Sequence, residues 1–423
     1  MTHTPRQRLR LALLRAISNN PIPLRSAPGT IVPNLQSPIS NILLIRPDHL
    51  GDLLFSTPTL RLLRQRYPSA HITALVGPWG APILAHNPHV DEIITLPFPG
   101  FARQPKPSPW QPYTLLRRWA RQLRGQYDLA FILRFDHWWG ALLAYLARVP
   151  LRVGYAVPEV APFLSHALPY SAGRHEVEQN WILGTGYSSP RSGAKRDWGL
   201  GIVVPGAEPL APARSAGGSG IGDSSYQVPE PGEFPIEFYV PRQAEGWAGS
   251  LLRGDAHPIV IHPGAGAAIK LWRAEGWAAV ADALARETGA TILLSGSQAE
   301  RPLCEEIARQ MTAEARVMAG QTTLDQLAAL FARCRLVLGL DSGPLHLAVA
   351  VGAPTVHIYG PVDTATFGPW GAPERQRALT SAWPCIPCNR LDYRPDELAH
   401  HPCVREIRVD EVLNEARQAL LCK

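Results

Sequence analysis

Residues 341–346 combine polar side chains with a glycine where a strand is expected to pass into a helix. These residues are Asp341, Ser342, Gly343 and His346. The apolar run before them has the pattern of a strand buried on both faces, and Asp341 is a good N-cap for the helix that follows. Ligands of open α/β sheets bind at the carboxyl ends of strands, where a helix N-terminus favours an anionic group such as phosphate. The pattern therefore predicts an anion site, with a plain capped helix and a core histidine as the alternatives.

A glycine-containing loop followed by a lysine is the second candidate for phosphate binding. Gly264 and Gly266 follow the expected strand 259–262, and glycine lets a backbone approach phosphate closely. Lys270 comes after this loop; a solvated surface lysine is the alternative interpretation. The segment lacks the final glycine of the dinucleotide fingerprint and the Lys-Ser/Thr of a Walker loop, which disfavours a Rossmann dehydrogenase.

Two carboxylates stand near the starts of expected helices. Asp52 follows the first expected strand, and Glu300 follows the expected strand 291–294. An N-cap explains Asp52, and the helix dipole favours a carboxylate at the position of Glu300. From their positions alone, both residues have a purely structural interpretation.

Strands alternate with helices on both sides of a stretch rich in glycine and serine. In the first half we expect strands at 42–45, 71–76, 92–96 and 129–133, and helices at 53–66, 110–124 and 138–147. In the second half we expect strands at 259–262, 291–294, 336–340 and 355–359, and helices at 277–286, 300–310 and 324–333. This alternation predicts an α/β fold with two Rossmann-like parallel-sheet domains.

The chain divides into three parts. Residues 1–40 form an N-terminal extension, 41–250 a first domain and 251–423 a second domain. A Gly/Ser/Pro-rich insertion near 205–233 is typical of a flexible linker. In the extension, apolar residues share a helical face flanked by arginines, which fits an amphipathic helix on anionic lipid or a helix docked on the protein itself.

Charge is unevenly distributed along the 423 residues. The formal net charge is +6, but residues 1–150 carry 17 Lys+Arg and 6 Asp+Glu, a net of +11, which leaves −5 for the rest. A basic first part indicates an anionic partner such as an acidic glycolipid or a membrane surface. Nucleic acid is disfavoured because no nucleic-acid-binding signature accompanies the charge. No run of 18 apolar residues predicts a membrane span, and six cysteines do not indicate a secreted disulfide scaffold, so we expect a cytoplasmic protein.

Three cysteines near the C-terminus have a spacing close to that of a zinc site. Cys385 and Cys388 are followed by His400, His401 and Cys403. A single Cys-x-x-Cys with one further cysteine is weaker evidence than a paired motif. We expect structural thiols and no metal here, with zinc as the alternative.

Three segments in order resemble the ADP-heptose:lipopolysaccharide heptosyltransferases, glycosyltransferase family 9. They are ILLIRPDHLGDLLFSTP at 42–58, IHPGAGAAIKLW at 261–272, and DSGPLHL at 341–347 with Gly360-Pro361 beyond it. Order and spacing match over roughly residues 41–420 apart from the insertion. The resemblance implies two Rossmann-like domains facing across a cleft (the GT-B arrangement), with the acceptor bound on the first domain and the nucleotide-sugar donor on the second. It implies no obligatory metal and no cofactor.

The resemblance also implies roles for single residues. Asp52 matches the catalytic carboxylate of the family and would serve as general base, because a sugar hydroxyl is a poor nucleophile. Lys270 matches the lysine that contacts phosphate, and Glu300 would accept hydrogen bonds from the ribose hydroxyls of the donor. The other matches to the donor site are Gly264, Gly266, Asp341, Ser342, Gly343 and His346.

The sequence therefore predicts an inverting glycosyltransferase. It would move a heptose-like sugar from a nucleotide diphosphate sugar to an anionic glycolipid or polysaccharide, in peripheral contact with the inner face of the plasma membrane. Another GT-B nucleotide-sugar enzyme such as an epimerase, and a non-catalytic nucleotide- or carbohydrate-binding protein, are the alternatives. The presence of both Asp52 and Lys270 argues against the non-catalytic protein, while the extension and the insertion depart from the family and leave the acceptor open.

Overall fold

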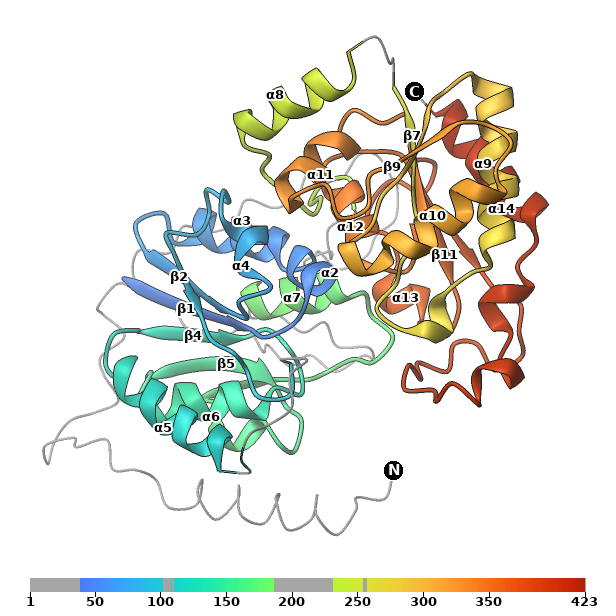
Figure 1. Cartoon of the computed structure of the whole chain (residues 1–423). Helices are drawn as coiled ribbons and strands as arrows, with labels where there is room; N and C mark the ends of the chain where they lie inside the picture. Colours follow the sequence, from blue (N-terminus) through green and yellow to red (C-terminus); the bar gives the residue numbers. More distant parts are fainter. Residues whose placement is uncertain (1–38, 102–107, 109, 186–230, 254–256, 423) are drawn as a thin grey trace, which may run out of the picture. The chain divides into compact units, whose positions relative to one another are not determined.

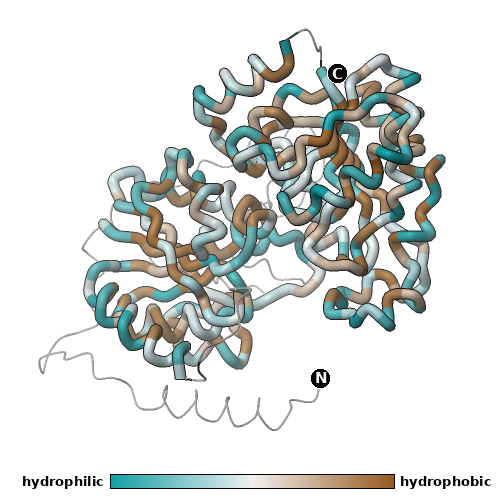
Figure 2. The backbone as a smooth tube through the Cα atoms, viewed as in Figure 1, coloured by the Kyte–Doolittle hydropathy of each residue, from teal (hydrophilic) through white to brown (hydrophobic). Residues whose placement is uncertain are grey.

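Two parallel β-sheets form the framework of the protein (Figure 1). The computed structural model describes residues 39–101, 108, 110–185, 231–253 and 257–422. Each sheet has six strands with helices packed against it, which confirms the predicted α/β fold class and its two parallel-sheet domains. Hydrophobic residues concentrate inside each sheet-and-helix layer (Figure 2).

The first sheet has the strand order β3-β2-β1-β4-β5-β6. Its strands are β1 (Asn41–Arg46), β2 (His71–Val76), β3 (Glu92–Thr95), β4 (Leu129–Ile132), β5 (Leu151–Tyr155) and β6 (His166–Leu168). The strand β1 pairs with both β2 and β4, so Ile42 lies opposite Ile72 on one side and Leu129 on the other. The order reverses between β1 and β4, which makes their carboxyl ends the switch point of this sheet.

Besides the short α2 (Leu50–Leu54), five helices lie in the described part of the first half of the chain. They are α3 (Thr57–Arg66), α4 (Ala81–Leu84), α5 (Gln111–Gln122), α6 (Trp138–Leu146) and α7 (Glu176–Thr185). The single helix predicted at 53–66 is instead divided into a short α2 (Leu50–Leu54) and α3. Pro58 has no N–H to donate to the carbonyl of Leu54, so a continuous helix is interrupted and a new one begins with proline in its first turn.

The second sheet repeats this topology with the order β12-β11-β10-β7-β8-β9. Its strands are β7 (Ile259–His262), β8 (Ile292–Leu294), β9 (Ala315–Val317), β10 (Leu336–Leu340), β11 (Thr355–Tyr359) and β12 (Gln376–Thr380). Its helices are α8 (Arg242–Leu251), α9 (Ala274–Thr288), α10 (Arg301–Gln310), α11 (Leu324–Phe331), α12 (Gly343–Ala350), α13 (Thr364–Phe367) and α14 (Val409–Leu421). The switch point here lies between β7 and β10.

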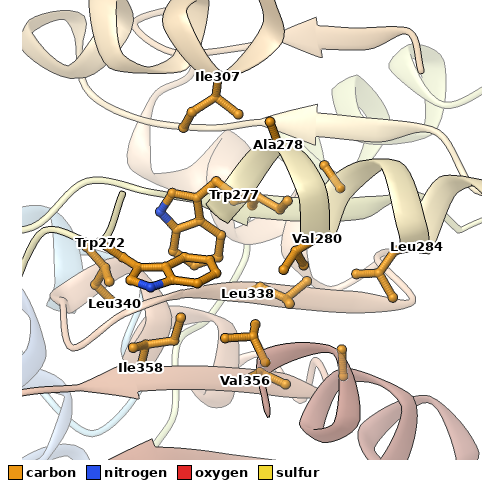
Figure 3. Close-up of a cluster of buried hydrophobic side chains, with 14 of the residues drawn as sticks. Trp272, Trp277, Ala278, Val280, Leu284, Ile307, Leu338, Leu340, Val356 and Ile358 are labelled. Carbon is orange, nitrogen blue, oxygen red and sulfur yellow. The ribbon is translucent and has the colours of Figure 1, made fainter. Parts of the chain in front are cut away.

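The core of the second sheet fixes the loop that follows β7. Trp272 and Trp277 are buried and pack edge to face, with ring centroids 4.9 Å apart (Figure 3). The Trp272 Nε1 donates a hydrogen bond of 3.0 Å to the backbone oxygen of Ile407. Lys270 is separated from Trp272 only by Leu271, so the buried indole fixes the position of the lysine backbone.

Contacts divide the chain into two compact units. The first comprises Met1–His49, Ser56–Ala172 and Val177–Pro229, and the second comprises Leu50–Phe55, Gly173–Glu176 and Glu230–Lys423. The second unit therefore includes α2, although α2 directly follows β1 in the sequence.

The helix α8 also belongs to the second unit. It precedes the boundary placed near residue 250 from the sequence, but its Ala244 and Ala248 pack on Ala329 of α11. Residues 1–38 and 186–230, which hold nearly all of the N-terminal extension and most of the insertion, lie outside the described residues. In the part that is described, no helix is long and apolar enough to cross a membrane.

Candidate active site

Lys270 and Asp341 form an ion pair at the switch point of the second sheet. The Lys270 Nζ lies 2.6 Å from Oδ2 of Asp341 and also donates to the backbone oxygen of Asp341 at 3.4 Å. The two side chains are 14% and 9% exposed. The fold thus joins two predicted donor residues from the loops that follow β7 and β10, which pair in register.

Ser342 is the N-cap of α12, a role that the sequence analysis wrongly gave to Asp341. The carboxylate of Asp341 instead accepts a hydrogen bond from Lys270, in which both partners carry a full charge. The Ser342 hydroxyl is buried and has no hydrogen-bond partner among the described residues. A buried polar atom without a partner at a helix N-terminus is suited to bind a ligand.

His346 approaches Asp341 from the side opposite Lys270. Its Nε2 lies 3.9 Å from Oδ1 of Asp341, and its ring is 4.6 Å from that of Phe55 in an edge-to-face contact. Burial alone would raise the pKa of Asp341, but His346 and Lys270 together lower it below its usual value. Asp341 therefore remains ionised at neutral pH, with a cation on one side and an imidazole on the other.

The short helix that carries Asp52 packs directly on the start of α12. A Cβ added to Gly51 would lie 3.0 Å from Cδ2 of His346, and one added to Gly343 would lie 2.9 Å from Cβ of Leu50. Glycine at both positions permits this close approach. Asp52 is partly exposed and follows Gly51, so it belongs to the same unit as the Lys270–Asp341 pair.

Glu300 lies against the glycine loop that follows β7. Its Oε2 accepts hydrogen bonds from the backbone nitrogen and the hydroxyl of Ser297, at 2.7 and 2.8 Å, in a capping box. Its carboxylate contacts Gly264 so closely that a Cβ at that position has no room. Glu300 therefore has a structural role at the start of a helix, as its position in the sequence allowed. Its close contact with residue 264 explains why that residue is glycine. Gly266 is exposed at the tip of the loop.

His175 is a residue of this neighbourhood that lies in none of the segments singled out from the sequence. His175 is buried, and its Nε2 lies 3.0 Å from the backbone oxygen of Gly368. Its ring packs on Phe55, which in turn contacts His346. Burial lowers the pKa of His175 to about 4, so the imidazole is neutral at physiological pH. These contacts link α2, residues 173–176 and α12, and no local pattern could have indicated them.

The first unit has its own charged cluster at its switch point, which the sequence analysis did not single out. Asp48 is buried and forms ion pairs with Arg46 (Nε to Oδ2, 2.8 Å) and with Arg134. Burial alone would raise the pKa of Asp48, but the two arginines lower it. Arg134 also pairs with the exposed Asp136 at 2.5 Å. The cluster joins the loops after β1 and β4, where sheets of this kind bind ligands.

The cysteines do not gather into a metal centre. Among the described residues, no group of three or more His, Cys, Asp or Glu side chains is placed to hold a metal ion. Cys385 and Cys388 are exposed and Cys403 is buried, all three as free thiols.

The predicted donor residues, from Gly264 to His346, lie in a region that matches a known family, whereas Asp52 and His175 lie outside it. Residues 231–395 match the model described as glycosyltransferase family 9 (heptosyltransferase). The resemblance to the heptosyltransferases of glycosyltransferase family 9, predicted from the three segments, is confirmed. The chain is a sugar-transferring enzyme.

Curated relatives extend the match beyond this region. The chain is 27% identical over 402 residues to lipooligosaccharide heptosyltransferase 2 of Haemophilus ducreyi, over 90% of this chain and 99% of the relative. It is 28% identical over 328 residues to lipopolysaccharide heptosyltransferase 2 of Escherichia coli K12, over 76% of this chain and 82% of the relative.

Solved structures share the fold of this chain. A glycosyltransferase of family 9 from Veillonella parvula superposes with a TM-score of 0.67 at 21% identity, over 91% of this chain and 98% of that one. The ADP-heptose lipopolysaccharide heptosyltransferase II of E. coli superposes with a TM-score of 0.63 at 22% identity, over 90% and 98%.

Proposed function

We propose that this enzyme is an inverting heptosyltransferase that uses a nucleotide diphosphate sugar and acts on a glycolipid or polysaccharide of the cell envelope. The observation that carries the proposal is the Lys270–Asp341 pair beside the N-terminus of α12, with the helix of Asp52 packed against it. A cation, a helix N-terminus and a carboxylate within one unit are the groups that such a transfer needs.

The donor diphosphate would lie over the start of α12. The N–H groups of that helix and the Lys270 ammonium supply positive charge, which stabilises the nucleoside diphosphate as it leaves. The unpartnered Ser342 hydroxyl would donate to a phosphate oxygen, and Glu300, fixed beside Gly264, would accept from the ribose hydroxyls. With positive charge provided in this way, we propose that the transfer has no obligatory metal.

Asp52 would act as the base. As the acceptor hydroxyl oxygen attacks the anomeric carbon, the bond from that carbon to the diphosphate oxygen breaks, and the hydroxyl proton passes to the Asp52 carboxylate. A single displacement of this kind inverts the anomeric configuration. The nucleoside diphosphate departs with the bonding electrons and is neutralised by Lys270.

The sugar is proposed to be heptose and the donor ADP-heptose, since the matched relatives are named heptosyltransferases and one solved neighbour is named for ADP-heptose. We assign acceptor binding to the first unit, which contains the Asp48–Arg134 cluster and most of the basic residues in 1–150. Such an acceptor is anionic, and we place the enzyme in the cytoplasm, in peripheral contact with the inner face of the plasma membrane.

A panel of nucleotide sugars tests the donor, because a ligand that binds only the folded state raises the melting temperature. ADP-heptose should raise it, and the Lys270→Ala variant should lose most of that shift. Incubation with heptose-free lipopolysaccharide core should then release ADP only when the acceptor is present. A shift with UDP-sugars alone, or an interconversion of the donor sugar without acceptor, would contradict the proposal.

A further inference from the structure

The helix α5 of the first unit has one buried and one exposed face. Leu116, Ala120 and Leu123 pack into the hydrophobic core of the first sheet, and α5 lies beside α6 (Figure 1). The opposite face is exposed and contains aromatic and basic side chains, with no acidic residue anywhere in the helix.

Five exposed residues on α5 or directly beside its ends form a single stripe within a wider exposed face. We define the α5 stripe as Trp110, Tyr113, Arg117, Arg121 and Arg124. Their spacing of three and four positions places them on one side of a helix. Trp110 is 73% exposed and Tyr113 is 51% exposed, which is unusual for large aromatic side chains of a globular protein. The aromatics stand at the N-terminal end of the stripe and the arginines follow.

Several arginines at the surface of the second unit form ion pairs with carboxylates. Arg301 pairs with Glu305, Arg408 with Asp410 and Arg417 with Glu287. Within the described part of the chain, the stripe arginines form no such ion pair. Asp128, the next acidic residue along the chain, accepts hydrogen bonds from the backbone nitrogens of Ser40 and Asn41 instead.

Helix stability does not account for this arrangement. Basic residues in the last turn of a helix interact favourably with its dipole, which would explain Arg121 and Arg124. Arg117 lies in the middle of the helix, and the dipole gives no reason for exposed aromatics at its start. Unpaired arginines beside an exposed tryptophan and tyrosine form instead the combination found at membrane interfaces, where amphipathic rings lie among headgroups and basic side chains bind anionic lipid.

We propose that the α5 stripe docks the enzyme on a membrane surface that contains anionic phospholipid. This inference rests on the peripheral membrane contact proposed above, and it assigns that contact to particular residues of the first unit. Trp110 and Tyr113 insert among the headgroups, and the arginines bind lipid phosphates. Because the attraction is electrostatic, it weakens as salt rises.

Co-sedimentation of the full-length protein with vesicles tests the proposal. The vesicles are phosphatidylcholine alone, or phosphatidylcholine with one part in three of phosphatidylglycerol. The parent should bind only the anionic vesicles, and less at high salt. The triple variant Arg117→Gln, Arg121→Gln and Arg124→Gln should bind roughly a hundredfold more weakly, at about fivefold per surface arginine. Trp110→Ala should also weaken binding, whereas Trp383→Ala, at an exposed tryptophan of the second unit, should not.

A matched triple variant removes the same charge elsewhere. Arg253, Arg316 and Arg335 are exposed in the second unit, and their change to glutamine should leave vesicle binding as in the parent. Equal loss in both triple variants, or no vesicle binding by the parent, would overturn the proposal. So would a parent that binds single-stranded RNA through the stripe more tightly than anionic vesicles. ADP affinity, measured on the same samples, reports separately on the donor site, so a failure here leaves the proposed function intact.

Discussion

The Lys270 ammonium is held by two acceptors of a single residue, the carboxylate and the backbone carbonyl of Asp341. The charge of Lys270 is therefore neutralised by a carboxylate of its own unit. Under the proposed function, a donor diphosphate would compete with Asp341 for Lys270, and the carboxylate would hold the ammonium near the start of α12.

The first prediction concerns Lys270 and donor affinity. Lys270→Ala should weaken ADP binding at least tenfold, because a charge-assisted contact to phosphate contributes about 1.5–3 kcal/mol. Isothermal calorimetry gives the affinity, and Arg316→Ala, an exposed cation of the same unit, is the control that should bind like the parent. Unchanged affinity in a folded Lys270→Ala protein would remove the lysine from the donor site.

The second prediction tests the close packing of α2 on α12. Gly343→Ala should lower the free energy of unfolding by about 1–3 kcal/mol, because the new methyl group overlaps Leu50. Urea denaturation measures the change. Gly246→Ala, in a helix position with no atom within 4 Å of the added Cβ, should be neutral or stabilise by roughly 0.5–1 kcal/mol. Equal effects of the two substitutions would argue against the tight helix contact.

The third prediction concerns His175 and pH. Its pKa in the folded state is about 4, below the usual 6.5 of a histidine, so only the unfolded state is protonated between these values. The contribution of His175 to stability is therefore complete above pH 6.5 and is lost as pH falls toward 4. His175→Gln should reduce the fall in the free energy of unfolding between pH 7 and pH 4.5 by about 2–3 kcal/mol.

Urea denaturation at the two pH values measures this difference. The control is His400→Gln, at an exposed histidine, which should keep the pH dependence of the parent. An unaltered pH dependence in the His175→Gln protein would show that the imidazole is not kept neutral by burial.

The central strands of both sheets could be predicted from the sequence because long-range packing and local pattern agree there. The strands β7, β10 and β11 are mostly apolar and fully buried, and their observed bounds are the predicted ones. The strands β5, β6, β9 and β12 were not predicted, because they are short or only partly buried and give no apolar run.

The residues of the candidate site could be predicted only in part. The motifs singled out Lys270 and Asp341, but capping rules predicted Asp341 as the N-cap of the following helix. The ion pair with Lys270 joins positions 71 apart, so no local rule could predict it. His175 and Phe55 come together from distant segments by packing, which no spacing rule describes. The placement of α2 in the second unit likewise depends on the contacts of Gly51 and Gly343, which a sequence shows only as two glycines.

The transfer rate of Asp52→Asn tests the central claim most directly, because asparagine keeps the shape and the capping ability of the side chain but cannot accept the proton. With ADP-heptose and heptose-free lipopolysaccharide core, the rate should fall about 10²–10⁴-fold, the loss usual for a general base. Donor affinity should match the parent, and the melting temperature should change by no more than about 2 °C. A variant that binds donor normally and keeps more than roughly a tenth of the parent rate would contradict the assignment of Asp52 as the base.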